Sequence, residues 1–306
     1  MEIFTDFDKM DGRPMAVTIG SFDGVHRGHR AMIDEAREKA AQRNLPLTVI
    51  TFARHPRLLF SRSEAPFLLT STDEKLSLLA SAGVERCLLL PFDQNMASLS
   101  ARDFMQCVLK DRMNVAMLAV GYDHRFGSPS SGEGVEQYIA YGKEMGVEVI
   151  ELHPYAPGGD AISSSKIRGA LTAGDMQRAA QLLGYDYSFT GRVVKGAAIG
   201  RQLGFPTANI SLSEPYKMLP LDGVYECSIA FNTNVYKGVM NIGCKPTLDG
   251  KERTIEVFII GFDGDIYGEN VKVDVQRRLR GERRFSGLDE LRAQIELDVR
   301  SVIDNK

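Results

Sequence analysis

The sequence predicts an α/β doubly wound parallel sheet followed by a small antiparallel β-barrel with a C-terminal helix, and three observations predict it. In the first half, short apolar runs alternate with amphipathic stretches, which is typical of parallel strands joined by helices. Beyond residue 187 the apolar runs are separated by Gly, Asn and Asp, as in a closed barrel. The 306 residues also suffice for two cores, which we expect at residues 1–184 and 187–306.

The first half is predicted to form a sheet flanked by helices. Its polar N-terminal stretch, residues 1–13, predicts an edge strand or a tail. Strands are expected at 15–20, 47–52, 87–90, 115–120 and 147–150, and helices at 28–44, 71–83, 100–113 and 134–146. Ligands bind beyond the carboxyl ends of the strands in such sheets. The loops after the first, second, fourth and fifth strands should therefore meet at one edge.

The second half begins with further helix up to Gly184 and then changes to strands. These strands are expected at 189–194, 223–230, 235–240, 255–260 and 271–275. Residues 232–234 and 263–265 are candidates for hairpin turns because they are rich in Asn, Asp and Gly. A final helix should pack on the barrel through apolar residues that recur at helical spacing: Leu288, Leu291, Ile295, Val299 and Val302.

Composition and charge argue against several classes of protein. A nucleic-acid coat or a protein held on a membrane surface would favour a strongly basic face, whereas the net charge is −3. No window approaches the roughly 20 apolar residues of a spanning helix, and the acidic N-terminus lacks the pattern of a signal peptide. The four cysteines are far apart and form no C-x-x-C pair, so we expect neither a disulfide framework nor a zinc site, and a cytoplasmic location.

The stretch from residue 20 to residue 29 carries the strongest chemical signal. An apolar run feeds a glycine-rich turn that opens a helix, and this arrangement binds phosphate through backbone N–H groups and the helix dipole. His26 and His29 stand three residues apart where the phosphates would lie. A metal pair is the alternative interpretation, although no third ligand is obvious. The turn residues expected to contact a nucleotide are Gly20, Phe22, Asp23 and Gly24.

A second glycine-rich loop runs from Gly196 to Asn209 and includes Gly200 and Gly204. It leads into a β element and has no G-K-[ST] sequence, so it is not a Walker A P-loop. Taken alone, its Pro-Thr end could be only a proline turn followed by a threonine cap.

These motifs resemble a known enzyme family. The Gly-x-Phe-Asp-Gly-x-His-x-Gly-His run of residues 20–29 resembles the signature of bacterial bifunctional riboflavin kinase/FMN adenylyltransferases, also called FAD synthetases. Together with the Ile-Ser-Ser-x-x-Ile-Arg element of residues 162–168, it is similar to the wider nucleotidyltransferase superfamily, whose sheet is Rossmann-like. The Gly-Phe-Pro-Thr-Ala-Asn string of residues 204–209 resembles the riboflavin kinase signature. The resemblance covers nearly the whole chain.

For the first half, the resemblance implies transfer of AMP from ATP to the phosphate of FMN. His26 and His29 would stabilise the pentacoordinate transition state, and Asp123 would lie near the ribose or a metal ion. The β- and γ-phosphates would be held by Ser164, Ser165 and Arg168. The flavin would lie near Arg54, His55, Pro56 and Arg57. The chain departs from the family at Arg54, where proline is usual, and at His124, where an aromatic residue is usual.

For the second half, the resemblance implies phosphorylation of riboflavin. Thr207 and Asn209 would help to ligate Mg²⁺-ATP through neutral oxygens, which suit Mg²⁺. Glu256 would accept the proton of the attacking hydroxyl. The nucleotide loop would contain Gly196, Gly200 and Gly204, and the flavin would be bordered by Arg284 and Phe285, which open an R-F-x-x-L-x-x-L motif.

The implied enzyme uses ATP twice, with Mg²⁺ at both sites. Riboflavin and ATP give FMN and ADP, and FMN and ATP give FAD and pyrophosphate. One alternative is a riboflavin kinase whose adenylyltransferase activity is weak or lost, because of Arg54 and His124. An RNA-binding or scaffolding protein with a basic tail at 277–285 is another, but the negative net charge and the lack of interleaved aromatic residues speak against it. We expect no nucleic-acid or membrane partner, and the oligomeric state stays open.

Overall fold

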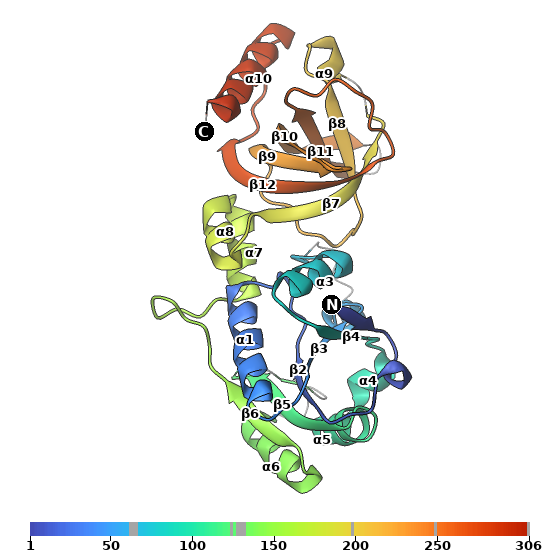
Figure 1. Ribbon diagram of the computed structural model, residues 1–306. Coiled ribbons are helices and arrows are strands. Elements are labelled where there is room, and N and C mark those ends of the chain that lie inside the picture. The colour runs from blue at the N-terminus through green and yellow to red at the C-terminus, as the bar shows by residue number, and fades with distance from the viewer. Residues whose placement is uncertain (61–66, 123–124, 127–132, 197–198, 248–249, 305–306) are drawn as a thin grey trace. The chain divides into compact units, whose positions relative to one another are not determined.

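The computed structural model describes residues 1–60, 67–122, 125–126, 133–196, 199–247 and 250–304 (Figure 1). The chain divides into two compact units. The first unit comprises Met1–Glu64 and Lys75–Ser163, and the second comprises Ala65–Glu74 and Ser164–Lys306. Within the described ranges, no helix is long and apolar enough to cross a membrane.

The first unit contains a parallel sheet of six strands in the order β1-β4-β3-β2-β5-β6. The strands are β1 (Glu2–Phe4), β2 (Met15–Ile19), β3 (Leu47–Phe52), β4 (Arg86–Leu90), β5 (Val115–Gly121) and β6 (Glu148–Leu152). The predicted parallel sheet is therefore confirmed, and β1 confirms the edge strand expected within residues 1–13. Every residue of β2 is buried because the strand lies at the centre of the sheet with both faces covered.

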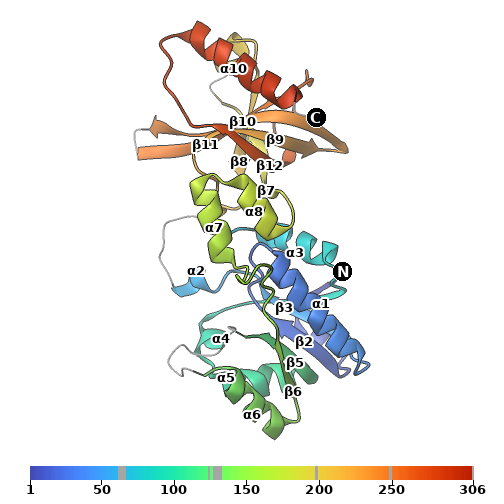
Figure 2. The ribbon, with the colours of Figure 1, turned by 90° about the vertical axis from the view of Figure 1, so that its left-hand side faces the viewer.

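Helices cover both faces of this sheet (Figure 2). One face packs against α1 (Arg27–Ala41) and α3 (Thr72–Ser81), of which the residues up to Glu74 belong to the second unit. The opposite face packs against α5 (Ala101–Asp103), the π-helix Phe104–Lys110 and α6 (Val135–Met145). Three short helices complete the unit: the 3₁₀ turn Phe7–Lys9, α2 (Arg57–Phe60) and α4 (Gln94–Ser98).

The helix predicted at residues 100–113 differs in type from the observed structure. Ser100 caps a single α-helical turn, and a π-helix then follows, in which the Asp111 amide donates to the Gln106 carbonyl five residues back. The buried residues at positions 104, 105, 108 and 109 lie on one face in either kind of helix. Apolar spacing therefore indicated a helix here without distinguishing an α-helix from a π-helix.

The second unit contains α7 (Ser164–Ala173), α8 (Met176–Leu183) and a closed barrel in the order β10-β11-β8-β7-β12-β9. Its strands are β7 (Tyr187–Val194), β8 (Thr207–Leu212), β9 (Gly223–Phe231), β10 (Asn234–Thr247), β11 (Gly250–Ile259) and β12 (Asn270–Arg280). The short α9 (Ile199–Gln202) precedes β8, and α10 (Leu288–Ile303) lies beside the barrel (Figure 1). The predicted antiparallel barrel and terminal helix are confirmed.

Two local predictions for this unit need correction. The hairpin at 232–234 is present, with Asn232 at φ +52° between β9 and β10, but 263–265 is not a hairpin turn. It joins β11 to β12, and β12 pairs with β7 and β9, because turn composition marks a reversal of direction without selecting the strand that pairs next. Leu288 does not pack on the barrel: it is 58% exposed at the start of α10, whereas Val302 is fully buried.

A buried ion pair attaches the first turn of α3 to the loop between β8 and β9. Lys217 Nζ lies 2.6 Å from Glu74 Oε2 and donates to the carbonyl of Leu69 at 2.5 Å. Glu74 Oε1 accepts from the backbone N–H of Thr190 at 2.8 Å. Both charged side chains are at least nine-tenths buried, so these partners replace the water that each charge loses.

We therefore predict that Lys217→Met destabilises the second unit strongly, because it leaves the Glu74 carboxylate buried without its cation. The expected loss is about 3–5 kcal/mol of unfolding free energy, measured by urea denaturation. Lys272→Met, which removes a half-exposed partner of Asp274, should cost less than about 1 kcal/mol. The double variant Glu74→Leu/Lys217→Met should recover part of the loss, and a double variant as unstable as Lys217→Met would contradict this account.

Candidate functional sites

The glycine-rich turn between β2 and α1 has an unusual backbone. Phe22, Gly24 and Val25 all have positive φ angles, of 47°, 84° and 34°. Phe22, Asp23 and Val25 are nevertheless buried, so the turn is held in this conformation by its packing. Non-glycine residues with positive φ cost of order 1–3 kcal/mol each and are found mainly at functional sites.

His26 caps α1 with its own imidazole ring. Its Nδ1 accepts from the backbone N–H of His29 at 3.2 Å, which assigns the proton of the neutral ring to Nε2. The two histidine rings are stacked, with centroids 3.6 Å apart, and the edge of the His29 ring meets Phe22. A Cβ atom on Gly28 would lie 3.1 Å from His26 Nδ1, so glycine leaves room for this ring.

Burial, more than any other cause, keeps His29 neutral. Desolvation, His26 and Lys75 together lower the pKa of His29 well below its usual value. Its Nδ1 is buried without a hydrogen-bond partner in the part of the chain that the structure describes. Neutral histidines can lie stacked without charge repulsion, and each can offer one N–H group to a phosphate oxygen.

Lys75 is a residue near this turn that sequence reasoning missed. It is 7% exposed, and its Nζ donates to the carbonyl of Phe52 at the end of β3. Burial lowers the pKa of Lys75 to about 8, and the charge of Asp23 opposes that shift. Sequence reasoning had no signal for it, because a lysine in the first turns of a helix usually points into solvent.

The loops after β3, β2, β5 and β6 leave the same edge of the sheet, because these four strands are adjacent and parallel. The carbonyl of Ile162, after β6, would lie 3.4 Å from a Cβ atom on Gly28. Arg54 and Arg57 are exposed after β3, where His55 Nδ1 accepts from the Arg57 amide at 3.2 Å and Pro56 is half-buried. Asp123 and His124 lie outside the described residues.

The serine and arginine residues predicted for the same site begin α7. Ser164 and Ser165 form its first turn, and Arg168 Nε donates to the carbonyl of Phe67 at 2.7 Å. These residues are described with the second unit, so whether they join the histidines stays a prediction.

The barrel brings the three residues predicted for the kinase reaction together. In the β8–β11 ladder, Asn209 lies opposite Glu256 and Thr207 lies opposite Phe258. Thr207 Oγ1 donates to Glu256 Oε2 at 3.4 Å. On the other side of β11, Glu256 pairs with Asn241 of β10, so Glu256 has an asparagine opposite it on each neighbouring strand.

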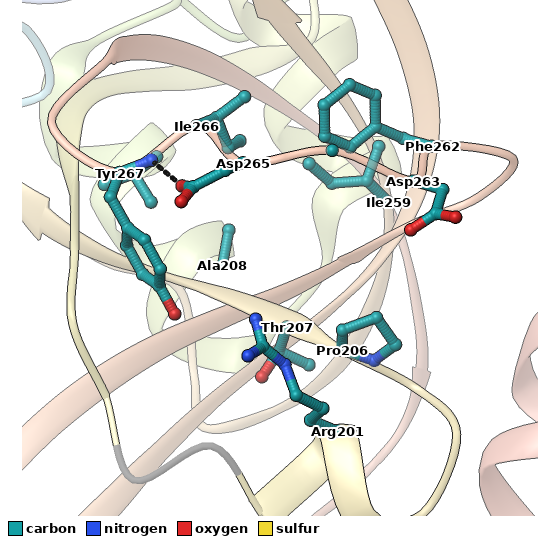
Figure 3. A pocket seen from close by; sticks show the side chains of 12 residues that line it. Arg201, Pro206, Thr207, Ala208, Ile259, Phe262, Asp263, Asp265, Ile266 and Tyr267 are labelled. Atoms are coloured by element: carbon teal, nitrogen blue, oxygen red, sulfur yellow. Dashed lines mark hydrogen bonds between the residues drawn. The ribbon is translucent and has the colours of Figure 1, made fainter.

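Two cavities meet at Thr207, which lines both. The Tyr267 cavity has a volume of about 290 Å³, and Figure 3 shows Arg201, Thr207 and Tyr267 around it. The Phe285 cavity has a volume of about 280 Å³ and contains Glu256. Its remaining walls come from residues 200–205, from β9, β10 and β11, from residues 280–285 and from α10, and they are mainly apolar.

The predicted glycines lie tightly against Thr207 and Asn209. A Cβ atom on Gly196 would lie 2.2 Å from Asn209 Nδ2, and one on Gly200 would lie 2.3 Å from the carbonyl of Phe205 and 3.4 Å from Thr207 Oγ1. Gly204 has φ +85°, a conformation that favours glycine. Gly196 and Gly200 thus provide space for close contact, whereas Gly204 provides a turn.

Of the two residues predicted to border the flavin in this half, only one lines the Phe285 cavity. Phe285 does so, whereas Arg284 is exposed and does not. Arg280 and Arg283 do line it, with guanidinium carbons 5.8 and 4.7 Å from the Phe285 ring centroid. The other polar and apolar residues that line this cavity include Asn241, Glu282, Leu291, Ile295 and Asp298, and of these Asp298 had no signal in the sequence.

Metal binding can be judged from the donor atoms present. Among the residues that the structure describes, no three His, Cys, Asp or Glu side chains gather around one point. Thr207, Asn209 and Glu256 instead offer oxygen donors within a few residues of one another on paired strands. Such a sparse oxygen set suits Mg²⁺, which takes most of its ligands from phosphates and water.

Comparison with known proteins gives concordant results for both halves. A family model described as FAD synthetase matches residues 8–166, and one described as riboflavin kinase matches residues 183–305. The chain is similar to the "Bifunctional riboflavin kinase/FMN adenylyltransferase" of Escherichia coli K12, with 40% identity over 92% of this chain and 90% of the relative. The protein of that name from Bacillus subtilis is 35% identical over 94% of this chain and 91% of the relative.

A solved structure resembles the whole chain. A protein from Streptococcus pneumoniae, titled "Macrolide-efflux Protein", superposes with a TM-score of 0.88 at 31% identity and covers 99% of each chain. Its title names a different activity from the curated relatives. The family models and curated relatives agree with each other over both halves of this chain, so they carry the functional conclusion.

The neutral state of His29 predicts a pH-dependent stability for the first unit. The folded pKa lies below the unfolded value of about 6.5, so the unfolded chain binds more protons and stability falls as pH drops below about 6.5. The loss should reach at most about 1.4 kcal/mol per pH unit for this group. Urea titrations at several pH values measure it.

His29→Gln should reduce that pH slope, whereas His153→Gln, at an exposed histidine, should keep it. An unchanged slope in His29→Gln would contradict the assignment of the effect to this residue.

Proposed function

The chain belongs to the family of bifunctional riboflavin kinase/FMN adenylyltransferases, and from this we propose how its residues carry out the two reactions. In the C-terminal domain riboflavin and ATP give FMN and ADP, and in the N-terminal domain FMN and ATP give FAD and pyrophosphate. We assign the adenylyltransferase to residues 1–184 and the kinase to residues 187–306. We also assign the enzyme to the cytoplasm, where ATP is abundant.

The kinase assignment rests on one observation: Thr207 lines both cavities, and its Oγ1 lies 3.4 Å from Glu256 Oε2. The mainly apolar Phe285 cavity suits the flavin ring, and the Tyr267 cavity suits the nucleotide. The terminal hydroxyl of riboflavin then meets the γ-phosphate beside Thr207. Its oxygen bonds to the γ-phosphorus, the bond to the β–γ bridging oxygen breaks, and ADP leaves while Glu256 accepts the hydroxyl proton.

Mg²⁺ fits the same place in the barrel. Thr207 and Asn209 would hold it through neutral oxygens, and Gly196 and Gly200 leave the loop close enough for phosphates to complete the set. When bound, Mg²⁺ neutralises phosphate charge. The side chains orient the two substrates, and the apolar neighbours of Glu256 limit access of water.

Adenylyl transfer needs charge stabilisation more than a base, because its nucleophile is already an anion. A phosphate oxygen of FMN bonds to the α-phosphorus of ATP, the bond to the β-phosphate breaks, and pyrophosphate leaves. We propose that His26, through Nε2–H, and His29 donate to the oxygens of the α-phosphate at the N-terminus of α1. The remaining assigned contacts are Gly20, Phe22, Asp23, Gly24, Asp123, Ser164, Ser165 and Arg168 with the nucleotide, and Arg54, His55, Pro56 and Arg57 with the flavin.

We predict that His29→Ala lowers FAD formation by at least about 100-fold, because a transition-state donor is lost. FMN formation from riboflavin should stay within twofold of wild type, since the barrel is untouched. Incubation with riboflavin, Mg²⁺ and ATP, followed by chromatography of the flavins, measures both products. His153→Ala is the matched control in the same unit, and loss of both products in a folded His29→Ala protein would refute two independent sites.

The reverse behaviour is expected of Glu256→Gln. Phosphorylation of riboflavin should fall by about 10²–10⁴-fold because the proton acceptor is gone, while supplied FMN is still converted to FAD. Glu269→Gln, at an exposed glutamate of the same unit, should leave both reactions unchanged. Normal kinase activity in Glu256→Gln would exclude this residue as the base.

The same assay tests the alternative of a kinase with weak adenylyltransferase activity. FMN without FAD from the wild-type protein would select that alternative, and it would point to Arg54 and His124, where the chain departs from the family.

A further inference from the structure

Two facing walls of the Phe285 cavity differ in origin. The barrel supplies one through Val224, Val239 and Phe258, and α10 supplies the other through Leu291, Ile295 and Asp298, while residues 200–207 and 282–285 complete the lining. The position of α10 therefore contributes to the width of the space between these two walls. This inference rests on the proposed function, in which riboflavin occupies that cavity.

One ion pair joins the two walls. Arg280, the last residue of β12, donates from Nε to both oxygens of Asp298 at 3.1 Å and from Nη2 to Oδ2 at 2.8 Å. Gln294 Nε2 donates to Oδ1 at 3.0 Å, so both carboxylate oxygens have partners. Asp298 is 6% exposed. A buried carboxylate with this fork geometry is strongly held, and removal of one partner leaves a charge that the site cannot solvate.

Within the described residues, the apolar contacts of α10 with the barrel gather near its C-terminal end, where Val299 and Val302 pack with Val224 and Val239. The carbonyl of Val302 also accepts from Lys237 Nζ at 3.2 Å. Leu288 and Leu297 are 58% and 59% exposed. Leu291 and Ile295, which line the cavity, lie before these contacts along the helix, and Asp298 is the residue between them and the C-terminal contacts that pairs with β12.

We propose that Arg280 and Asp298 are a positioning pair that holds α10 at the separation a flavin ring fills, and so set the affinity of the kinase for riboflavin. Neither residue takes part in phosphoryl transfer. Arg280 also lies over the Phe285 ring, at 5.8 Å from its centroid, so the pair orients the aromatic residue of the cavity as well. The nucleotide in the Tyr267 cavity does not depend on it.

The test uses the full chain and the variant Asp298→Asn, which keeps the shape and removes the charge. The KM for riboflavin should rise at least about tenfold, with kcat within threefold and the KM for ATP unchanged, as expected for loss of uniform substrate binding. Quenching of riboflavin fluorescence without ATP should show the same loss of affinity. The FMN-to-FAD reaction of the same chain reports the amount of active protein.

Glu226→Gln is the matched control. It breaks a similar pair on β9 and β12, in which Arg277 Nη2 lies 2.9 Å from Glu226 Oε2 with the carboxylate 8% exposed, but neither residue lines the Tyr267 cavity or the Phe285 cavity. Its riboflavin KM should stay near the wild-type value. An equal rise in both variants would mean general softening of the barrel and would overturn the proposal.

The double variant Arg280→Met/Asp298→Leu separates positioning from direct contact. An apolar pair of similar size can hold the helix, so riboflavin affinity should return toward wild type. A double variant as weak as Asp298→Asn would mean that one of the two residues contacts the flavin directly, which overturns the proposal. So would an unchanged riboflavin KM in Asp298→Asn, or a fall in kcat at constant KM.

Two further results, a variant that does not fold and a wild-type chain without kinase activity, can be told apart from a failure of the proposal. If Asp298→Asn does not fold, Arg280→Lys, which keeps the charge and loses the fork, should raise the riboflavin KM in its place, and a wild-type KM there would overturn the proposal. If the wild-type chain makes no FMN, the proposed function fails, and the fluorescence titration still tests the positioning role.

Discussion

The short ladder between β8 and β11 is the contact on which the kinase site depends. It closes that side of the barrel and places Asn209 opposite Glu256, with Thr207 two residues away on the same face of β8. A slip of one residue would turn Thr207 and Asn209 to the other face of the sheet and separate them from Glu256. The barrel therefore contributes a fixed register as well as a cavity, and that register brings Thr207, Asn209 and Glu256 together.

The two reactions use ATP through different physical devices. At the turn between β2 and α1, the two histidine rings are stacked, and positive φ angles at Phe22 and Val25 are part of that geometry. In the barrel, the glycines instead let a loop lie against Thr207 and Asn209. In the proposed function, the first arrangement would stabilise charge on the α-phosphate, whereas the second would position an alcohol and accept its proton.

Two buried ion pairs join elements of the second unit. Glu74 in the first turn of α3 pairs with Lys217, and Arg280 at the end of β12 pairs with Asp298 of α10. Each pair is surrounded by further hydrogen bonds, as burial of an ion pair requires. Such pairs add little net stability compared with apolar packing, but they accept only one geometry, which suits elements that form the wall of a binding cavity.

Local patterns in the sequence determined both fold classes and the residues whose chemistry depends on neighbours along the chain. The glycine-rich turn that opens α1 at His26 and His29 was predictable from the sequence, because a turn and its following element are set by adjacent residues, whereas its phosphate-binding role stays a prediction. Only the tertiary structure decided the roles of Lys75, Arg280 and Asp298, because a charged residue differs from a surface residue only through burial and partners distant in sequence. For the same reason, only the tertiary structure decided that Arg283 rather than Arg284 lines the Phe285 cavity. It also decided that residues 263–265 join two strands that do not pair with each other.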